Sequence, residues 1–178
     1  VYVYSGSDGS ALGATELESP GYAGDNDHFG WSVAALGNSQ NVDGIDHLVG
    51  APGFTTNLGD GAEDGVFLLF TGDSGDSIAE ALGFQGDGVT SVGLASAGLG
   101  DVGTGGITGT TTPPDTTKDG LNDYIILANE GAAIMGGFYD DDESFRGFLA
   151  GTFGAVAGIG DADGDDTPDY VLGDSSYD

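Results

Sequence analysis

Cysteine is absent from the 178 residues of this chain. The absence excludes disulfide bonds, thiolate metal sites and cysteine nucleophiles together. A protein outside the cell that lacks disulfides needs another means of holding its loops. The abundant aspartate makes bound calcium the expected one.

Basic residues are almost absent as well, because Lys118 and Arg146 are the only two beside 30 acidic residues. The formal net charge of -28 repels phosphate backbones and anionic lipid headgroups. We therefore expect neither a nucleic-acid partner nor insertion into a membrane. The surface favours cations, held either at defined sites or as diffuse counterions of a solvated acidic surface like that of halophilic proteins.

Long apolar runs and sustained helical periodicity are missing too. No stretch approaches the roughly 20 apolar residues of a membrane-spanning helix, and no basic and apolar leader opens the sequence. Short runs of β-branched and aromatic residues instead alternate with turns that are rich in the 36 glycines. Since 38% of the residues are hydrophobic, the chain can bury a core, and the pattern predicts an all-β fold.

The sequence contains an internal repeat. Three segments align, each with a residue pair ending in glycine, a strand-like run, a polar stretch and a second apolar strand. The repeated glycines are Gly30, Gly93 and Gly154, which lie 63 and 61 residues apart. A period of this size is typical of solenoids and propellers, and about four short strands per unit is the make-up of a propeller blade.

The repeat divides the chain into four parts. We expect an outer half blade at residues 1–24, whole blades at 25–88 and 89–150, and an inner half blade at 151–178. Residues 1–4 match the strand at residues 66–70, so the chain enters and leaves in mid-blade and is expected to belong to a longer one. Each half blade exposes an unpaired edge, which either the rest of the longer chain or a second copy would cover. We expect the former, because closure within one chain avoids the entropy cost of association.

The first unit carries a family resemblance. Phe29-Gly30, then Gly50-Ala51-Pro52, with an acidic loop between them and a Gly-Val-Phe-Leu strand from Gly65, resembles the FG-GAP repeat of integrin alpha subunits and microbial surface proteins. In the second unit Leu127-Ala128-Asn129 stands in place of Gly-Ala-Pro. The resemblance covers nearly the whole chain and implies a partial β-propeller of four-stranded blades at the cell surface, with calcium in its loops and protein ligands.

The loop of the third unit has the form of a calcium site. Asp161, Asp163, Asp165 and Asp169 occupy positions 1, 3, 5 and 9, and Thr167 offers its carbonyl at position 7. Calcium takes about six to eight hard oxygen ligands, which such a loop supplies. The alternative is a solvated acidic turn, but four carboxylates at this spacing repel one another without a cation. Strands on both sides make it the strand-loop-strand site that FG-GAP repeats use.

The other two loops are less regular. In the second unit the candidate ligands are Asp115, Thr117, Asp119, Leu121 and Asp123, with Asp101 as an alternative to Asp115 at position 1. In the first unit, residues 38–46 carry Val42 at position 5. That loop is expected to bind calcium weakly or to be held by hydrogen bonds alone.

Nothing in the sequence predicts an enzyme. His28 and His47 lack the spacing of a metal helix or a nucleophile motif, and Trp31 is expected in the core. Acidic pairs among residues 25, 27, 60, 63 and 64 are expected by chance in so acidic a chain, and residues 140–143 form a charged turn. We expect an extracellular calcium-dependent adhesion or protein-recognition module. The alternatives are a subunit of a fibre or surface layer joined through blade edges and, less favoured, a propeller attached to a hydrolase.

Overall fold

The computed structural model describes residues 1–11, 26–39, 44–55, 65–70, 72, 77–79, 89–103, 118, 120–136 and 145–174. Within these ranges the regular structure consists of β-strands alone, so the prediction of an all-β chain is confirmed there. The same residues contain no helix that could cross a membrane.

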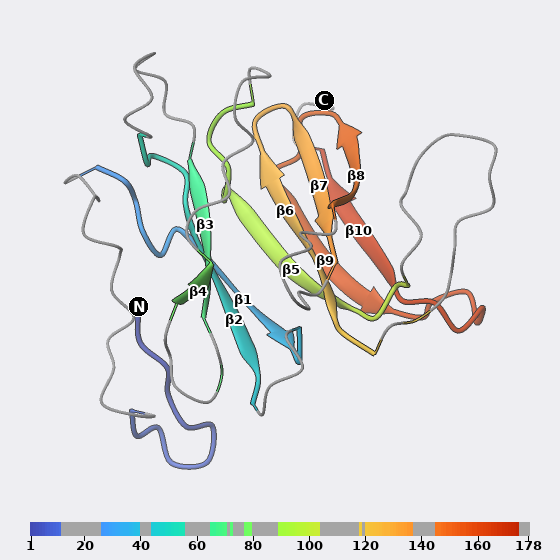
Figure 1. Cartoon of the computed structure of the whole chain (residues 1–178), viewed down its shortest axis with the longest axis horizontal. Coiled ribbons are helices and arrows are strands. Elements are labelled where there is room, and N and C mark those ends of the chain that lie inside the picture. Colours follow the sequence, from blue (N-terminus) through green and yellow to red (C-terminus); the bar gives the residue numbers. More distant parts are fainter. Residues whose placement is uncertain are drawn as a thin grey trace.

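Ten strands form three antiparallel sheets, none of which closes on itself (Figure 1). The first sheet has the order β1-β2-β3-β4 and the second the order β5-β6-β7-β8, while β9 and β10 form the third. The strands are β1 (Ser32–Gly37), β2 (Asp46–Ala51), β3 (Val66–Phe70), β4 (Ser77–Ala79), β5 (Ala95–Gly100), β6 (Asp123–Ala128), β7 (Gly131–Met135), β8 (Phe145–Ala150), β9 (Ala155–Gly160) and β10 (Asp169–Gly173).

The central strands of the two larger sheets are buried on both faces. Every residue of β3, β6 and β7 is buried, as is β2 except for the half-buried His47. Continuous apolar runs such as Val-Phe-Leu-Leu-Phe in β3 are what a strand covered on both sides requires. These central strands are therefore covered on both faces by other parts of the molecule.

The strands β1, β5 and β9, which open the three sheets, lie side by side with β5 in the middle (Figure 1). Glycine makes this close approach possible. A Cβ atom on Gly98 of β5 would lie 2.5 Å from the carbonyl oxygen of Ala35, and one on Gly158 of β9 would lie 2.4 Å from that of Gly98. Both distances are shorter than any tolerable contact, so these positions accept no side chain without movement.

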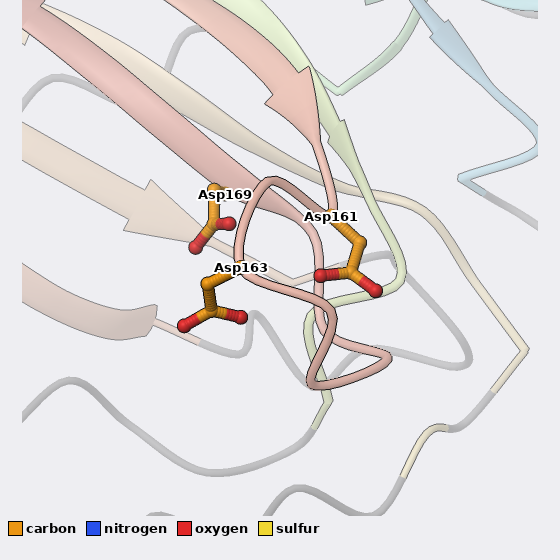
Figure 2. Close-up of side chains that lie close together, drawn as sticks. All are labelled: Asp161, Asp163 and Asp169. Carbon is orange, nitrogen blue, oxygen red and sulfur yellow. The ribbon is translucent and has the colours of Figure 1, made fainter.

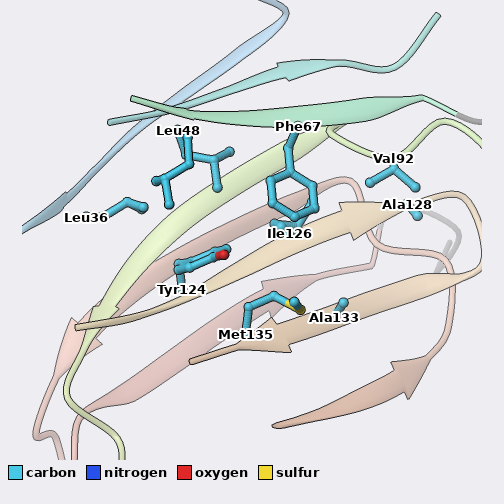
Figure 3. Close-up of a cluster of buried hydrophobic side chains, with 10 residues drawn as sticks. Leu36, Leu48, Phe67, Val92, Tyr124, Ile126, Ala128, Ala133 and Met135 are labelled. Carbon is cyan, nitrogen blue, oxygen red and sulfur yellow. The ribbon is translucent and has the colours of Figure 1, made fainter. Parts of the chain in front are cut away.

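One apolar cluster joins the first sheet to the second (Figure 3). Leu48 of β2 and Phe67 of β3 meet Tyr124 and Ile126 of β6, and the rings of Phe67 and Tyr124 pack edge to face with centroids 6.1 Å apart. A second cluster joins the other face of the second sheet, including Ile125, to the third sheet. Because side chains alternate along a strand, β6 serves both clusters.

The N-terminal segment covers the far face of the first sheet, opposite β5 (Figure 1). Val1 and Val3 pack against Val49, Leu68 and Phe70. Instead of the expected strand, residues 1–4 show one isolated bridge, between Tyr4 and Ala11. Residues 12–25, which complete the predicted outer half blade, lie outside the described ranges.

The prediction that Trp31 belongs to the core is wrong. Trp31 is 61% exposed. Its ring packs against that of His28, with the ring centroids 5.5 Å apart. Trp31 lies just before β1, whose own Val33 is equally exposed at 60%, so no described segment covers the molecule here.

Candidate metal-binding loops

The three loops that follow β1, β5 and β9 start from the same backbone frame. Each preceding strand ends in a glycine with positive φ, namely Gly37, Gly100 and Gly160 at 77°, 83° and 69°. Each glycine pairs with the aspartate that opens the next strand, Asp46, Asp123 or Asp169, and the pairing register shifts beside it. Glycine adopts this backbone conformation without the cost that a Cβ atom brings.

The paired aspartate closes each loop by one hydrogen bond. Its carboxylate accepts the backbone N–H of the residue two places after the glycine. The donors are Ser39 at 2.8 Å from Asp46, Val102 at 2.7 Å from Asp123, and Ala162 at 2.8 Å from Asp169. The three loops therefore share one closing contact, although its ends lie 7 residues apart in the first and third loops and 21 residues apart in the second.

In the third loop, three of the predicted ligands converge (Figure 2). One carboxylate oxygen each from Asp161, Asp163 and Asp169 lies within 4.8 Å of the others. Asp161 and Asp163 are exposed, and Asp169 is half-buried at the start of β10. Asp165 is not part of this group, and its carboxylate accepts the backbone N–H of Thr167 at 2.8 Å.

Backbone N–H groups hold Asp161 in place. Its Oδ1 accepts hydrogen bonds from Gly164 at 2.7 Å and Asp165 at 3.1 Å, and its Oδ2 accepts one from Asp166 at 3.0 Å. These donors, led by Gly164, hold the pKa of the Asp161 carboxyl below its usual value, with a smaller contribution from the charge of Lys118. The loop thus keeps this carboxylate ionised and pointed in a fixed direction, as a metal ligand must be.

The donor set suits a hard divalent cation. Three carboxylate oxygens gathered within 4.8 Å supply charge and hard oxygen ligands, and two of the three residues are exposed to solvent, which can supply further oxygen ligands. Without a cation, like charges this close destabilise one another. Calcium tolerates irregular coordination more readily than magnesium, which demands a near-ideal octahedron. The residues present therefore fit calcium.

In the second loop, Asp101 has the place that Asp161 has in the third. It follows Gly100 directly, and its Oδ2 accepts the backbone N–H of Gly120 at 2.9 Å, as Asp161 accepts that of Asp166. Asp123 and Leu121 are buried. The other predicted ligands Asp115, Thr117 and Asp119 lie outside the described residues.

The first loop is held by hydrogen bonds. Asp46 is fully buried, and besides the backbone N–H of Ser39 it accepts the Ser39 hydroxyl at 2.8 Å and the backbone N–H of Gly72 at 3.2 Å. Both of its oxygens thus have donors. Residues 40–43 of this loop lie outside the described ranges.

The remaining candidates do not assemble into a site within the described ranges. The acidic triad of the third loop is the one group of three potential metal ligands found there, and neither His28 nor His47 takes part in it. Asp27 caps a turn by accepting the backbone N–H of Phe29 at 3.2 Å. Its possible acidic partners at positions 25, 60, 63 and 64, and the charged run 140–143, lie outside the description.

Sequence reasoning missed the shared closing contact. The signal is visible, because β1, β5 and β9 end in Leu-Gly, Leu-Gly and Ile-Gly, each followed by Asn38, Asp101 or Asp161. It also missed a clasp in which Glu130 accepts the backbone N–H of Thr90 at 2.8 Å and its hydroxyl at 3.1 Å. Nothing in the local sequence marks that pair, since 40 residues separate its members.

Fold and loops together define the chain as an all-β protein of repeated antiparallel sheets with an acidic loop. No family model matches the chain, and a search of curated proteins found no match.

Proposed function

We propose that this chain is a calcium-binding β-propeller module of the FG-GAP type, which serves in adhesion or protein recognition outside the cell. The observation that carries the proposal is the acidic triad of Asp161, Asp163 and Asp169, mounted on a loop frame that occurs three times. The same frame in each repeat unit is what a structural metal loop needs. The metal would fix the loop between two strands of one sheet.

The arrangement of the sheets supports the propeller. The opening strands β1, β5 and β9 lie side by side, and each sheet is joined to the next by a buried apolar cluster. A propeller is built by such radial repetition, with the first strand of every blade nearest the axis. The resemblance of Phe29-Gly30 and Gly50-Ala51-Pro52 to the FG-GAP repeat points to the same architecture.

The exposure of the acidic triad supports a role outside the cell. Extracellular calcium modules bind with dissociation constants on the order of 0.1 to 1 mM, which matches a shallow and exposed triad better than a tight intracellular buffer site. With calcium holding the loops, the neighbouring surface is stiff enough to meet a protein partner. We propose no catalytic activity, because we assign the acidic triad to metal binding.

Calcium binding by the third loop tests the proposal. Titration calorimetry should detect calcium binding to the whole chain, and Asp163→Asn should weaken it at this site by tenfold or more. Asp166→Asn is the matched control, since Asp166 lies in the same loop, carries the same charge and is outside the triad. Its positive φ of 68° suits asparagine as well. Equal binding by both variants would refute the site.

Calcium should also stabilise the fold. A ligand that binds only the folded state stabilises it by about 2.7 kcal/mol at a hundredfold excess over its dissociation constant. The thermal midpoint should therefore fall when a chelator replaces calcium at matched ionic strength. Asp163→Ala combined with Asp165→Ala should lower the midpoint in calcium, imitating the effect of the chelator at the third loop.

A further inference from the structure

The third sheet exposes a face that the other two sheets bury. Ile159 of β9 and Val171 of β10 are 52% and 51% exposed. Ile159 is the counterpart of Leu36 and Leu99, which also stand just before the glycine that ends their strands. Val171 is the counterpart of Leu48 and Ile125, each two places after the paired aspartate.

Those four counterparts show what covers the face. Leu36 and Leu48 are buried against the second sheet. Leu99 and Ile125 are buried on the side that faces the third sheet. The exposed face of β9 and β10 is therefore built to receive the opposite face of another sheet of this kind.

The opposite kind of face, against which β9 and β10 could pack, is open on the first sheet. The N-terminal segment covers Leu68 and Phe70 of β3 but leaves β1 bare, and Val33 is 60% exposed. A groove with a volume of about 240 Å³ lies between this segment and strands β1 and β2. Its lining is Val1, Tyr2, Val3, Tyr4, Val33, Ala34, Ala35, His47, Leu48 and Val49.

The N-terminal segment holds the place of a third strand beside this groove. The third strand of the first sheet, β3, packs against the second sheet. Its Phe67 and Leu69 lie in one apolar cluster with Ala133 and Met135 of β7. On the first sheet, Val1 and Val3 pack in the same way beside Leu68 and Phe70. The groove is empty where the first and second strands of the same sheet as the N-terminal segment would lie. Strands β9 and β10 are such a pair of first and second strands. Among the described residues, β10 has no strand along its outer edge.

We propose that these 178 residues by themselves, without the further blades that a longer chain is expected to supply, associate head to tail as two copies, each placing its β9 and β10 in the groove of the other. The edge of β10 then lies beside residues 1–4 of the second copy, and Ile159 and Val171 become buried. Two copies supply six sheets, which is within the roughly four to eight blades of closed propellers. The contact is used twice and closes a two-fold ring. This proposal rests on the propeller proposed above, and it depends neither on its calcium nor on its protein partner.

Two features set the strength of the association. Ala35 stands where Gly98 and Gly158 permit close approach, so its methyl group holds the second copy's β9 slightly away. The net charge of -28 on each copy repels the other. We therefore expect dissociation at low protein concentration and low salt, and tighter association in molar salt.

The first experiment measures the mass in solution. Sedimentation equilibrium of the whole chain in calcium and molar salt should give twice 17.7 kDa at high protein concentration. Val171→Glu and Val33→Glu should each weaken association at least tenfold, while Phe145→Glu, at an exposed residue of β8, should leave it unchanged. Ala35→Gly should strengthen it. A monomer at every concentration, or a polymer that grows without limit, would overturn the closed pair.

The second experiment locates the contact and exploits the absence of cysteine. Ser32 and Ser96 meet across the first two sheets, with their hydroxyl oxygens 3.4 Å apart. Their counterparts at the new contact are Ala155 of one copy and Val33 of the other. The double variant Val33→Cys with Ala155→Cys should form a covalent dimer on oxidation, and neither single variant should. Failure of the double variant to cross-link would overturn the proposed register.

Calcium titrations on the same samples keep the two proposals apart. Intact calcium binding by a chain that stays monomeric would overturn only the paired assembly. A dimer that binds no calcium would overturn only the metal site.

Discussion

At the residue scale, one type of side chain has two roles in this molecule. Asp46, Asp123 and Asp169 each close a loop by accepting a backbone N–H. Among the described residues, only Asp169 of these three lies in a cluster of carboxylates, two of them exposed, whereas Asp46 is fully buried among its donors. A buried carboxylate is tolerated when donors satisfy it, and the hydrogen bonds from Ser39 and Gly72 satisfy Asp46.

Replacement of Asp46 should therefore weaken the fold. Asp46→Asn replaces one carboxylate oxygen by an amide NH2 group. This group cannot accept the hydrogen bonds that the replaced oxygen receives from Ser39 or from Gly72. The free energy of unfolding should fall by about 1–3 kcal/mol, the cost of a buried donor left unsatisfied. Urea denaturation measures the change. Asp8→Asn is the control, because Asp8 lies in an exposed turn where it accepts from Ser10, and the denaturation midpoint should hardly change.

At the element scale, β5 decides how the sheets stack. It lies between β1 and β9, and its backbone approaches both neighbours closely at Gly98. The carbonyl oxygen of Ala35 approaches Gly98 from one side, and that of Gly98 approaches Gly158 on the other. Each of the two contacts between sheets therefore depends on one glycine, Gly98 of β5 or Gly158 of β9.

A methyl group at this place should push two sheets apart. Gly98→Ala puts a Cβ atom 2.5 Å from the carbonyl oxygen of Ala35, so β1 and β5 must separate. We expect a loss of about 1–3 kcal/mol in the free energy of unfolding, as for other overpacked sites. Gly6→Ala is the control because a Cβ atom there meets nothing within 4 Å. Equal unfolding midpoints for the two variants in urea would show that β1 and β5 are less closely packed than described.

At the scale of the whole molecule, charge of one sign opposes compaction. The chain has 30 acidic residues and only two strong bases, and folding brings segments that are distant in sequence into three sheets. Metal at a few loops can neutralise only a small part of this charge. The remaining repulsion falls with ionic strength, since the Debye length is about 10 Å at 0.1 M salt.

Stability should therefore rise with monovalent salt even when calcium is saturating. We expect the thermal midpoint to increase between dilute buffer and molar sodium chloride, measured by circular dichroism at fixed protein and calcium concentration. The Val171→Glu variant serves as a comparison, because it should remain a monomer and so separates screening within one chain from association. An unchanged midpoint in both proteins would mean that bound counterions already neutralise the carboxylates.

The sequence by itself determined the β class, the period of the repeat and the acidic loop. These depend on neighbours along the chain: alternation and β-branched residues make strands, glycine permits turns, and aspartates at alternate positions of one short loop stay together. It also placed Asp101 among the candidates, although the long insertion after it left two alignments open. Its prediction for Trp31 was wrong because burial beside β1 depends on a covering segment, and no described segment covers Trp31 or the equally exposed Val33 of β1.

Only the tertiary structure decided which faces are covered. Leu48 and Val171 have similar surroundings in sequence, yet one is buried by a sheet from about 75 residues further along and the other has no such sheet over it in the described chain. Asp46 and Asp169 open equivalent strands, but donors such as Gly72, brought back by the next strands, bury the first alone. Burial depends on segments that are distant in sequence, and for that reason local pattern cannot specify it.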